Sequence, residues 1–92
     1  MIAEAPKYYV YKYNGKYVCC RDVNGTYTQV YKHLYLSEFV ESAMKFSENK
    51  YIEDYCFSSQ YISVKITNNL ILQKCERFSV YEKVLRNDVL VV

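Results

Sequence analysis

Two Asn-Gly pairs constrain this chain more than any other feature, because each lies between runs rich in tyrosine and valine. They are Asn14-Gly15 and Asn24-Gly25. Asn-Gly readily adopts the positive φ angles of a type I′ turn, whose twist joins two antiparallel strands directly. The sequence therefore predicts an N-terminal three-stranded antiparallel meander with strands over about 7–13, 16–23 and 26–34.

The two turns also predict how the strands pair. A two-residue loop fixes the register of a hairpin, and the register decides which face each side chain occupies. The predicted pairs are Tyr13–Lys16, Tyr11–Val18 and Tyr9–Cys20 in the first hairpin, and Val23–Thr26, Cys19–Val30 and Val18–Tyr31 in the second.

Side chains alternate along a strand, so this register divides the meander into two faces. An aliphatic stripe of Val10, Cys19 and Val30 crosses one face. Because these groups have no hydroxyl to satisfy, we assign their face to the interior and the tyrosine face to water or a partner. Tyrosine is also enriched at protein interfaces. The predicted partner-binding residues are Tyr9, Tyr11, Tyr13, Val18, Tyr27 and Tyr31.

The opposite assignment stays open, because several long basic side chains fall on the face taken as internal. If the faces are inverted, exposed rings lie beside cations, which is the combination that single-stranded nucleic acids bind. This alternative nucleic-acid face consists of Tyr8, Lys12, Tyr17, Arg21 and Lys32.

The rest of the chain predicts an α+β fold. Ser37 is placed as an N-cap, and apolar residues recur at helical spacing over about 38–48. Residues 61–75 alternate around a Thr67-Asn68-Asn69 turn and predict a second antiparallel hairpin. A capping-box spacing predicts a short C-terminal helix over about 80–86.

Two further expectations concern the segment between the main elements and the number of domains. Residues 51–57 fit a short helix better than a strand. A chain of 92 residues is too short to divide into two cores, so 1–92 is expected to form a single domain.

The residues that carry catalysis are sparse, so the chain is predicted not to be an enzyme. The only histidine is His33, and no carboxylate stands beside it in the sequence. The vicinal Cys19-Cys20 pair lacks the spacing of a zinc site. Gly15 and Gly25 are the only glycines, which excludes a glycine-rich phosphate loop. No cofactor or metal is expected.

Composition and charge favour a binding protein. The formal charge of +2 is too small to indicate nucleic acid by itself. No apolar run is long enough to span a membrane, and no signal peptide is visible, so a cytoplasmic location is expected. Lysine, asparagine, tyrosine and isoleucine are frequent, which is typical of AT-rich phage and viral genomes.

The leading hypothesis is therefore a non-catalytic module that binds a larger protein partner through its tyrosine face. A phage or viral inhibitor of host defence, such as an anti-CRISPR protein, is the specific form of this hypothesis. A homodimer through the same face is a close variant. The alternative is a single-stranded nucleic-acid-binding protein.

Overall fold

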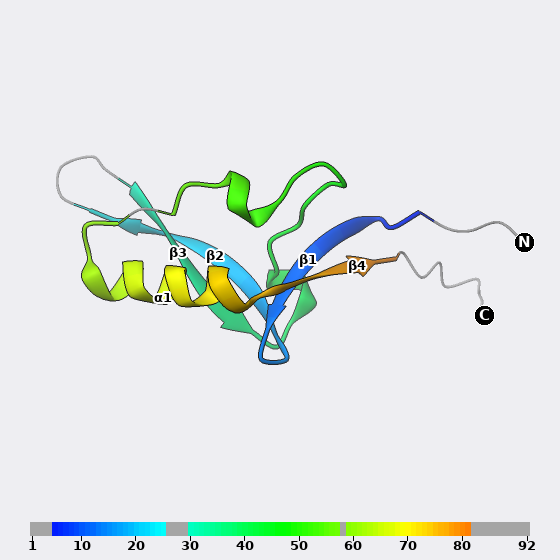
Figure 1. Ribbon diagram of the computed structural model, residues 1–92, viewed down its shortest axis with the longest axis horizontal. Helices are drawn as coiled ribbons and strands as arrows, with labels where there is room; N and C mark the ends of the chain where they lie inside the picture. Colours follow the sequence, from blue (N-terminus) through cyan, green and yellow to red (C-terminus); the bar gives the residue numbers. More distant parts are fainter. Residues whose placement is uncertain (1–4, 26–29, 58, 82–92) are drawn as a thin grey trace, which may run out of the picture.

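The computed structural model describes residues 5–25, 30–57 and 59–81. These residues form a small α+β fold with a four-stranded antiparallel sheet of order β3-β2-β1-β4 and one α-helix (Figure 1). The predicted fold class is thus confirmed, although the order of elements differs. The elements are β1 Tyr8–Tyr13, β2 Lys16–Asn24, β3 Val30–Ser37, the 3-10 turns η1 Val40–Ser42 and η2 Ile52–Asp54, α1 Ile62–Lys74, and β4 Glu76–Val80.

The first hairpin forms as the sequence predicts. Asn14 and Gly15 have φ angles of 53° and 80°, as a type I′ turn requires, and Tyr13 pairs with Lys16. The next pair joins Lys12 and Tyr17, and the register of β1 with β2 ends there. The outer edge of β1 is occupied by β4, and all five residues of β4 pair with β1.

Beyond these two pairs, β1 and β2 separate and the segment 43–46 fits between them. Tyr9 and Phe46 exchange backbone hydrogen bonds of 2.8 and 2.9 Å, and the Met44 N–H donates to the Val18 carbonyl over 3.1 Å. The predicted pairs Tyr11–Val18 and Tyr9–Cys20 are therefore wrong. Backbone groups of a distant segment satisfy these strands instead, and no local turn signal reports such a partner.

The second hairpin has a longer connection than predicted, and its register is shifted. Asn24 ends β2 opposite Val30, so Asn24-Gly25 does not form a two-residue loop. Residues 26–29, including Thr26 of the predicted Val23–Thr26 pair, lie outside the described part of the chain. Because the shift is an odd number of residues, it turns β3 over relative to β2. The observed partners are Tyr31 for Val23, Tyr35 for Cys19 and Leu36 for Val18.

This register explains which face becomes the interior. It aligns Leu34 with Cys20 and Leu36 with Val18, so that aliphatic side chains of β3 join the face that carries the β1 tyrosines. Burying that face removes these aliphatic side chains and the β1 tyrosine rings from water together. The core cluster consists of Tyr11, Val18, Leu34, Phe46, Ile52, Phe57 and Ile71.

The predicted orientation of the sheet is therefore wrong. Tyr11 and Val18 are 5% and 0% exposed, whereas Val30 is exposed. The Tyr11 hydroxyl accepts hydrogen bonds from the Ile52 N–H at 3.2 Å and from Arg77 Nη1 at 3.1 Å. These bonds remove the cost that had argued against burying a phenol. Val10 and Cys19 of the predicted aliphatic stripe are buried as well, so their assignment to the interior is confirmed, although they lie on the other face of the sheet from Tyr11 and Val18.

The predicted helix over 38–48 is also wrong. Only the single turn η1 forms there, and the chain then runs extended to make the bridge to β1. The Ser37 hydroxyl accepts the Phe39 N–H at 3.1 Å, so it closes a local turn instead of capping a helix. Tertiary pairing of the extended backbone has overridden helical spacing here. The short helix preferred over 51–57 is the single turn η2.

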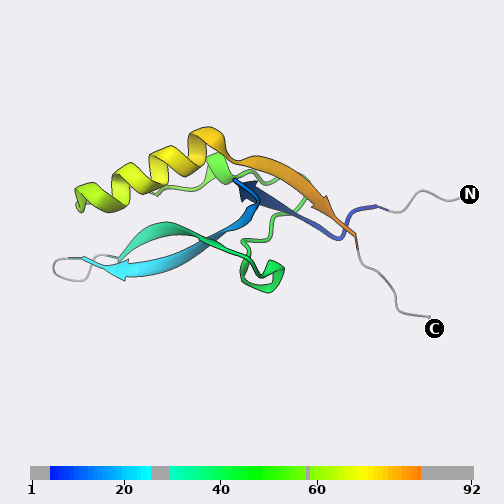
Figure 2. The same ribbon diagram turned by 90° about the horizontal axis from the view of Figure 1, so that it is seen from below.

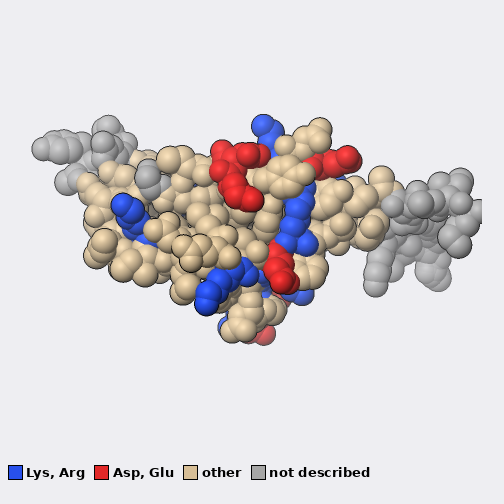
Figure 3. Space-filling model, viewed as in Figure 1, with Lys and Arg blue, Asp and Glu red and all other residues tan. Residues whose placement is uncertain are grey.

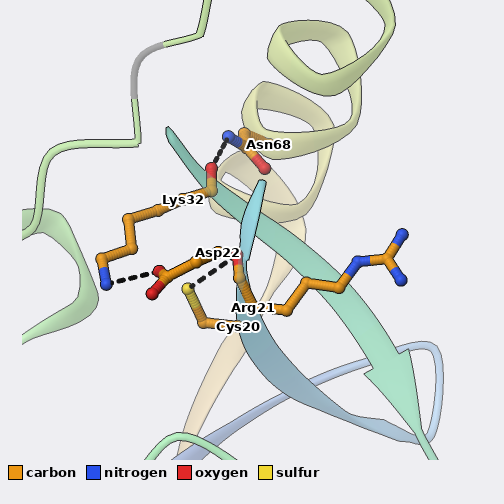
Figure 4. Close-up of polar contacts among 5 residues, drawn as sticks. All are labelled: Cys20, Arg21, Asp22, Lys32 and Asn68. Atoms are coloured by element: carbon orange, nitrogen blue, oxygen red, sulfur yellow. Dashed lines mark hydrogen bonds and ion pairs between the residues drawn. The ribbon is translucent and has the colours of Figure 1, made fainter. Parts of the chain in front are cut away.

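The second hairpin predicted over 61–75 is replaced by α1. Asn68, which was read as a turn residue, is buried within this helix. Its Oδ1 accepts the Leu34 N–H at 2.9 Å, and its Nδ2 donates to the Phe57 carbonyl at 2.7 Å. Nδ2 also donates to the Lys32 carbonyl at 2.9 Å (Figure 4). The amide thus pairs with the free edge of β3 as another strand would, and α1 covers that edge.

The C-terminal prediction is tested only at its start. Val80 is the last residue of β4, so the predicted helix over 80–86 does not begin there. Residues 82–86 lie outside the described part of the chain. Among the described helices, none has the length and apolar character that crossing a membrane requires.

Candidate nucleic-acid interface

The face of the sheet opposite the core gathers aromatic and basic side chains from all four strands. Two pairs on either side of β1 bring them together. Lys12 lies opposite Tyr17 of β2. Val10, which lies between Tyr8 and Lys12 on the same side of β1, is opposite Phe78 of β4. Lys45 joins from the segment between β1 and β2. We call this surface the basic aromatic face. It consists of Tyr8, Lys12, Tyr17, Arg21, Tyr35, Lys45 and Phe78.

Each cation of the face lies near at least one ring. Lys12 Nζ is 5.0 Å from the centre of the Tyr17 ring and 5.3 Å from that of Phe78. The Arg21 guanidinium lies 5.8 Å from Tyr35. Cation–π attraction at these distances holds the charges over the sheet instead of letting them extend freely into water.

Lys45 continues the same pattern where its segment enters the sheet. Its Nζ lies 5.5 Å from the Tyr8 ring and donates to the Glu41 carbonyl at 3.2 Å. Lys45, Arg21, Tyr35 and Phe78 are exposed, and Tyr8 and Tyr17 are half-buried. Rings that bases can stack on therefore lie beside cations that phosphates can approach.

The face continues into a hollow beside the first hairpin turn. Its volume is about 320 Å³, at the lower end of the range of small-molecule sites. Two lysines, an exposed ring and one carboxylate surround it. The lining residues are Lys12, Asn14, Gly15, Lys74, Glu76 and Phe78. A carboxylate repels phosphate but accepts hydrogen bonds from the amino groups of bases, so Glu76 suits a base edge and not the backbone.

His33 adds a titratable group to this face. It pairs with Arg21 across β2 and β3 and is half-buried. Burial lowers the pKa of His33, and the neighbouring Arg21 charge lowers it further. The imidazole is therefore neutral at pH 7 and becomes a further cation of the face on acidification.

Lys32 does not belong to the basic aromatic face, so one member of the alternative set is wrong. It lies opposite Asp22 on the other side of the sheet, and its Nζ is 2.7 Å from Asp22 Oδ1. Figure 4 shows Cys20, Asp22 and Lys32 on one side of the strands and Arg21 pointing away from them. The other four members, Tyr8, Lys12, Tyr17 and Arg21, share the face as predicted for the inverted sheet.

The predicted partner-binding tyrosines do not form an exposed surface. Tyr11 and Val18 belong to the buried cluster, and Tyr9 and Tyr13 pack against it. The Tyr31 ring is half-buried against Tyr61, with 6.3 Å between ring centres. Tyr27 lies outside the described residues.

Sequence reasoning missed Tyr35, Lys45 and Phe78. The register that places Tyr35 on this face depends on the long β2–β3 connection. Phe78 belongs to a strand that pairs with β1 across most of the chain, and no local spacing reports that pairing. The one available signal was the alternation of Tyr31, His33 and Tyr35 along a single strand.

Arg77 is committed to the fold and is not available to a ligand. Its guanidinium lies between the rings of Tyr9 and Tyr51, 4.2 Å from each centre. Its Nη atoms also donate to the carbonyls of Lys50, Ser47 and Glu48 over 2.7–3.2 Å. Figure 3 shows acidic side chains gathered over the segment that contains η2, with basic side chains beside them.

The described residues contain no group of three or more metal-ligating side chains. Burial raises the pKa of the Cys19, Cys20 and Cys75 thiols, which disfavours the thiolate needed for metal binding or nucleophilic attack. Comparisons of this chain with protein-family models, curated proteins and solved structures found no match.

Proposed function

We propose that this protein binds single-stranded nucleic acid through the basic aromatic face. The observation that carries the proposal is the exposed pairing of rings with cations, as in Arg21 over Tyr35 and Lys12 beside Phe78. Bases stack on any aromatic ring, so this surface tolerates many sequences, while the cations bind the backbone. Sheet-based RNA-binding domains use the same combination.

The modest charge of the chain sets the expected strength of binding. Lys12, Arg21, Lys45 and Lys74 are the described cations on or beside the face, so three or four phosphate contacts are available. For single strands each neutralised phosphate contributes a slope of about −0.7 in the logarithm of affinity against that of salt. Affinity should thus fall roughly 20- to 50-fold between 50 and 200 mM salt.

Fluorescence anisotropy with a labelled 12-nucleotide single strand tests the proposal. Arg21→Gln should reduce both the affinity and the salt slope, whereas Lys65→Gln removes an exposed charge from α1 and should change neither. Tyr35→Ser should weaken binding on the order of 5- to 100-fold through lost stacking. Equal effects of the two charge variants, or binding that ignores salt, would contradict the proposal.

The protein-binding hypothesis, with its anti-CRISPR form, is the second candidate. Its predicted contact set is largely internal, so it would need another surface. A protein interface anchored by aromatic rings responds weakly to salt. The same salt titration therefore separates the two candidates once a protein partner is in hand.

A further inference from the structure

The hollow beside the first hairpin turn is formed by segments that are distant in the sequence. Asn14 and Gly15 belong to the turn itself, and Lys74 and Glu76 stand on either side of the junction of α1 with β4. Figure 2 shows α1 passing directly into β4, which runs beside β1. Because Lys12 is the register partner of Glu76, the pairing of β1 with β4 fixes the positions of this cation and this carboxylate relative to one another.

Phe78 gives the hollow a surface on which one base can stack. It is 42% exposed and lies two residues after Glu76, on the same side of β4. Lys12 Nζ is 5.3 Å from the centre of its ring, so a base in contact with Phe78 also lies within reach of an ammonium donor. The volume of about 320 Å³ is that of a site for one small ligand. The hollow thus suits a single base of a strand that runs over the basic aromatic face.

The Glu76 carboxylate decides which base matches the hollow. In the part of the chain that the structure describes, its oxygens make no hydrogen bond or ion pair, so both are available to a ligand. An ionised carboxylate only accepts hydrogen bonds, and its two oxygens can accept from two neighbouring donors. Guanine is the one common base whose Watson–Crick edge carries two adjacent donors, N1–H and the N2 amino group. On the other bases, one carboxylate oxygen would face a ring nitrogen or a carbonyl oxygen.

The two lysines extend the match to the rest of the nucleotide. Guanine O6 is next to N1–H and accepts hydrogen bonds, and lysine is one of the side chains that bind it in DNA recognition. Lys12 can donate to O6 while Glu76 holds the two donors. A second hollow of about 330 Å³ shares Asn14 and Lys74 with the first, and the described residues that line it include no carboxylate. Lys74 is therefore placed to bind the phosphate of the same nucleotide.

We propose that the first hollow is a guanine-selective subsite. Glu76 accepts hydrogen bonds from N1–H and the N2 amino group, Lys12 donates to O6, and Phe78 stacks on the base. This inference rests on the proposed function, and it adds a preference at one position to a surface that otherwise tolerates many sequences. A guanine at this position should bind on the order of 10-fold more tightly than an adenine.

Competition against a labelled run of 12 thymidines tests the subsite with the protein unchanged. Each unlabelled competitor is a 12-nucleotide thymidine strand with a single substituted base, which keeps it free of secondary structure. The guanine strand should compete on the order of 10-fold more strongly than the adenine strand. Hypoxanthine lacks only the N2 amino group of guanine, so it should lose most of this preference. 7-Deazaguanine keeps the edge that Glu76 binds and should retain the preference.

Glu76→Gln is the corresponding change in the protein. It should bring the guanine and adenine strands to equal affinity, because an amide presents a donor in place of one acceptor. Glu53→Gln is the matched control: it removes another exposed carboxylate, from η2, and should leave the preference unchanged.

Two results would overturn the subsite while leaving the proposed function in place. One is equal competition by the guanine, adenine and hypoxanthine strands, all of which still bind. The other is a guanine preference that survives in Glu76→Gln. If no strand binds, the proposed function fails together with the subsite.

Discussion

At the scale of single residues, Asn68 is the side chain on which the junction of helix and sheet depends. Its amide makes three hydrogen bonds, two to β3 and one to the Phe57 carbonyl, and it is buried. An amide matches this task because it both donates and accepts, as a peptide group does.

Replacing Asn68 by Ala should destabilise the protein by about 3 kcal/mol, because the Leu34 N–H and two carbonyls lose their partner in a buried site. Asn68→Asp should cost at least as much at pH 7, since its carboxylate would face the two carbonyl oxygens. Urea denaturation measures both. Asn69→Ala, at the exposed neighbouring position, is the control and should change stability by less than about 0.5 kcal/mol. If Asn68→Ala lowers the free energy of unfolding only slightly, water replaces the amide as the hydrogen-bond partner of these backbone groups.

Two asparagines show what sequence can predict at this scale. Asn14 was placed correctly because the preference of Asn-Gly for positive φ is local and nothing overrides it in the first hairpin. The same preference did not produce a two-residue loop at Asn24-Gly25, where the pairing of β2 with β3 has a different register. Asn68 was assigned to a turn by the same kind of preference. Its partners Lys32 and Phe57 are distant in sequence, so no neighbouring residue signals that the amide serves a strand edge.

At the scale of elements, the hairpin predicted over 61–75 failed because the apolar residues of this segment fit the period of a strand as well as that of a helix. Apolar residues at Ile62, Val64 and Ile66 alternate as they do in a strand. They form a helix whose two opposite sides are both apolar, one against β3 and one outward. Such a helix has little amphipathic signal, so its period could not be recognised from this segment alone.

The orientation of the sheet leads to a prediction about two tyrosines. Tyr11→Ser should destabilise the protein by about 3–5 kcal/mol, because it empties a core position and removes the acceptor for the Ile52 N–H. Tyr35→Ser should cost less than about 1 kcal/mol, since this ring is exposed. Thermal melts followed by circular dichroism measure the difference. Similar melting temperatures for the two variants would show that the two faces of the sheet are not distinct in burial.

At the scale of the whole molecule, acidic and basic side chains are not separated into two regions. Acidic side chains gather over the segment that contains η2, and basic side chains lie beside them (Figure 3). The basic aromatic face also has a carboxylate next to it, because Glu76 pairs with Lys12 across β4 and β1. The sequence contained four of the residues of the face in an alternative set, but selecting that set required the register of β3.

The single histidine predicts how pH affects the molecule. The pKa of His33 is lowered in the folded state, so the unfolded chain binds the proton first as pH falls below about 6.5. Stability contributed by the neutral imidazole is therefore present above that pH and is lost as pH falls through the lowered pKa. Nucleic-acid affinity should move in the opposite direction, because protonated His33 adds a cation beside Arg21.

Anisotropy and urea denaturation between pH 7.5 and 5.5 measure these two trends. His33→Gln should remove the part of the pH dependence of nucleic-acid affinity and of stability that His33 causes. An affinity that is independent of pH in the wild type, or a trend that persists unchanged in His33→Gln, would remove His33 from the interface.

The central claim is that the exposed face of this sheet, and not its tyrosine-rich interior, binds single-stranded nucleic acid. Backbone amide chemical shifts, recorded as a 12-nucleotide single strand is added, test it most directly. The account predicts shifts at Lys12, Tyr17, Arg21, Tyr35 and Phe78, with Ile62 and Ile66 on the outward side of α1 unaffected. Shifts confined to α1, or no shifts at 50 mM salt and millimolar oligonucleotide, would contradict it.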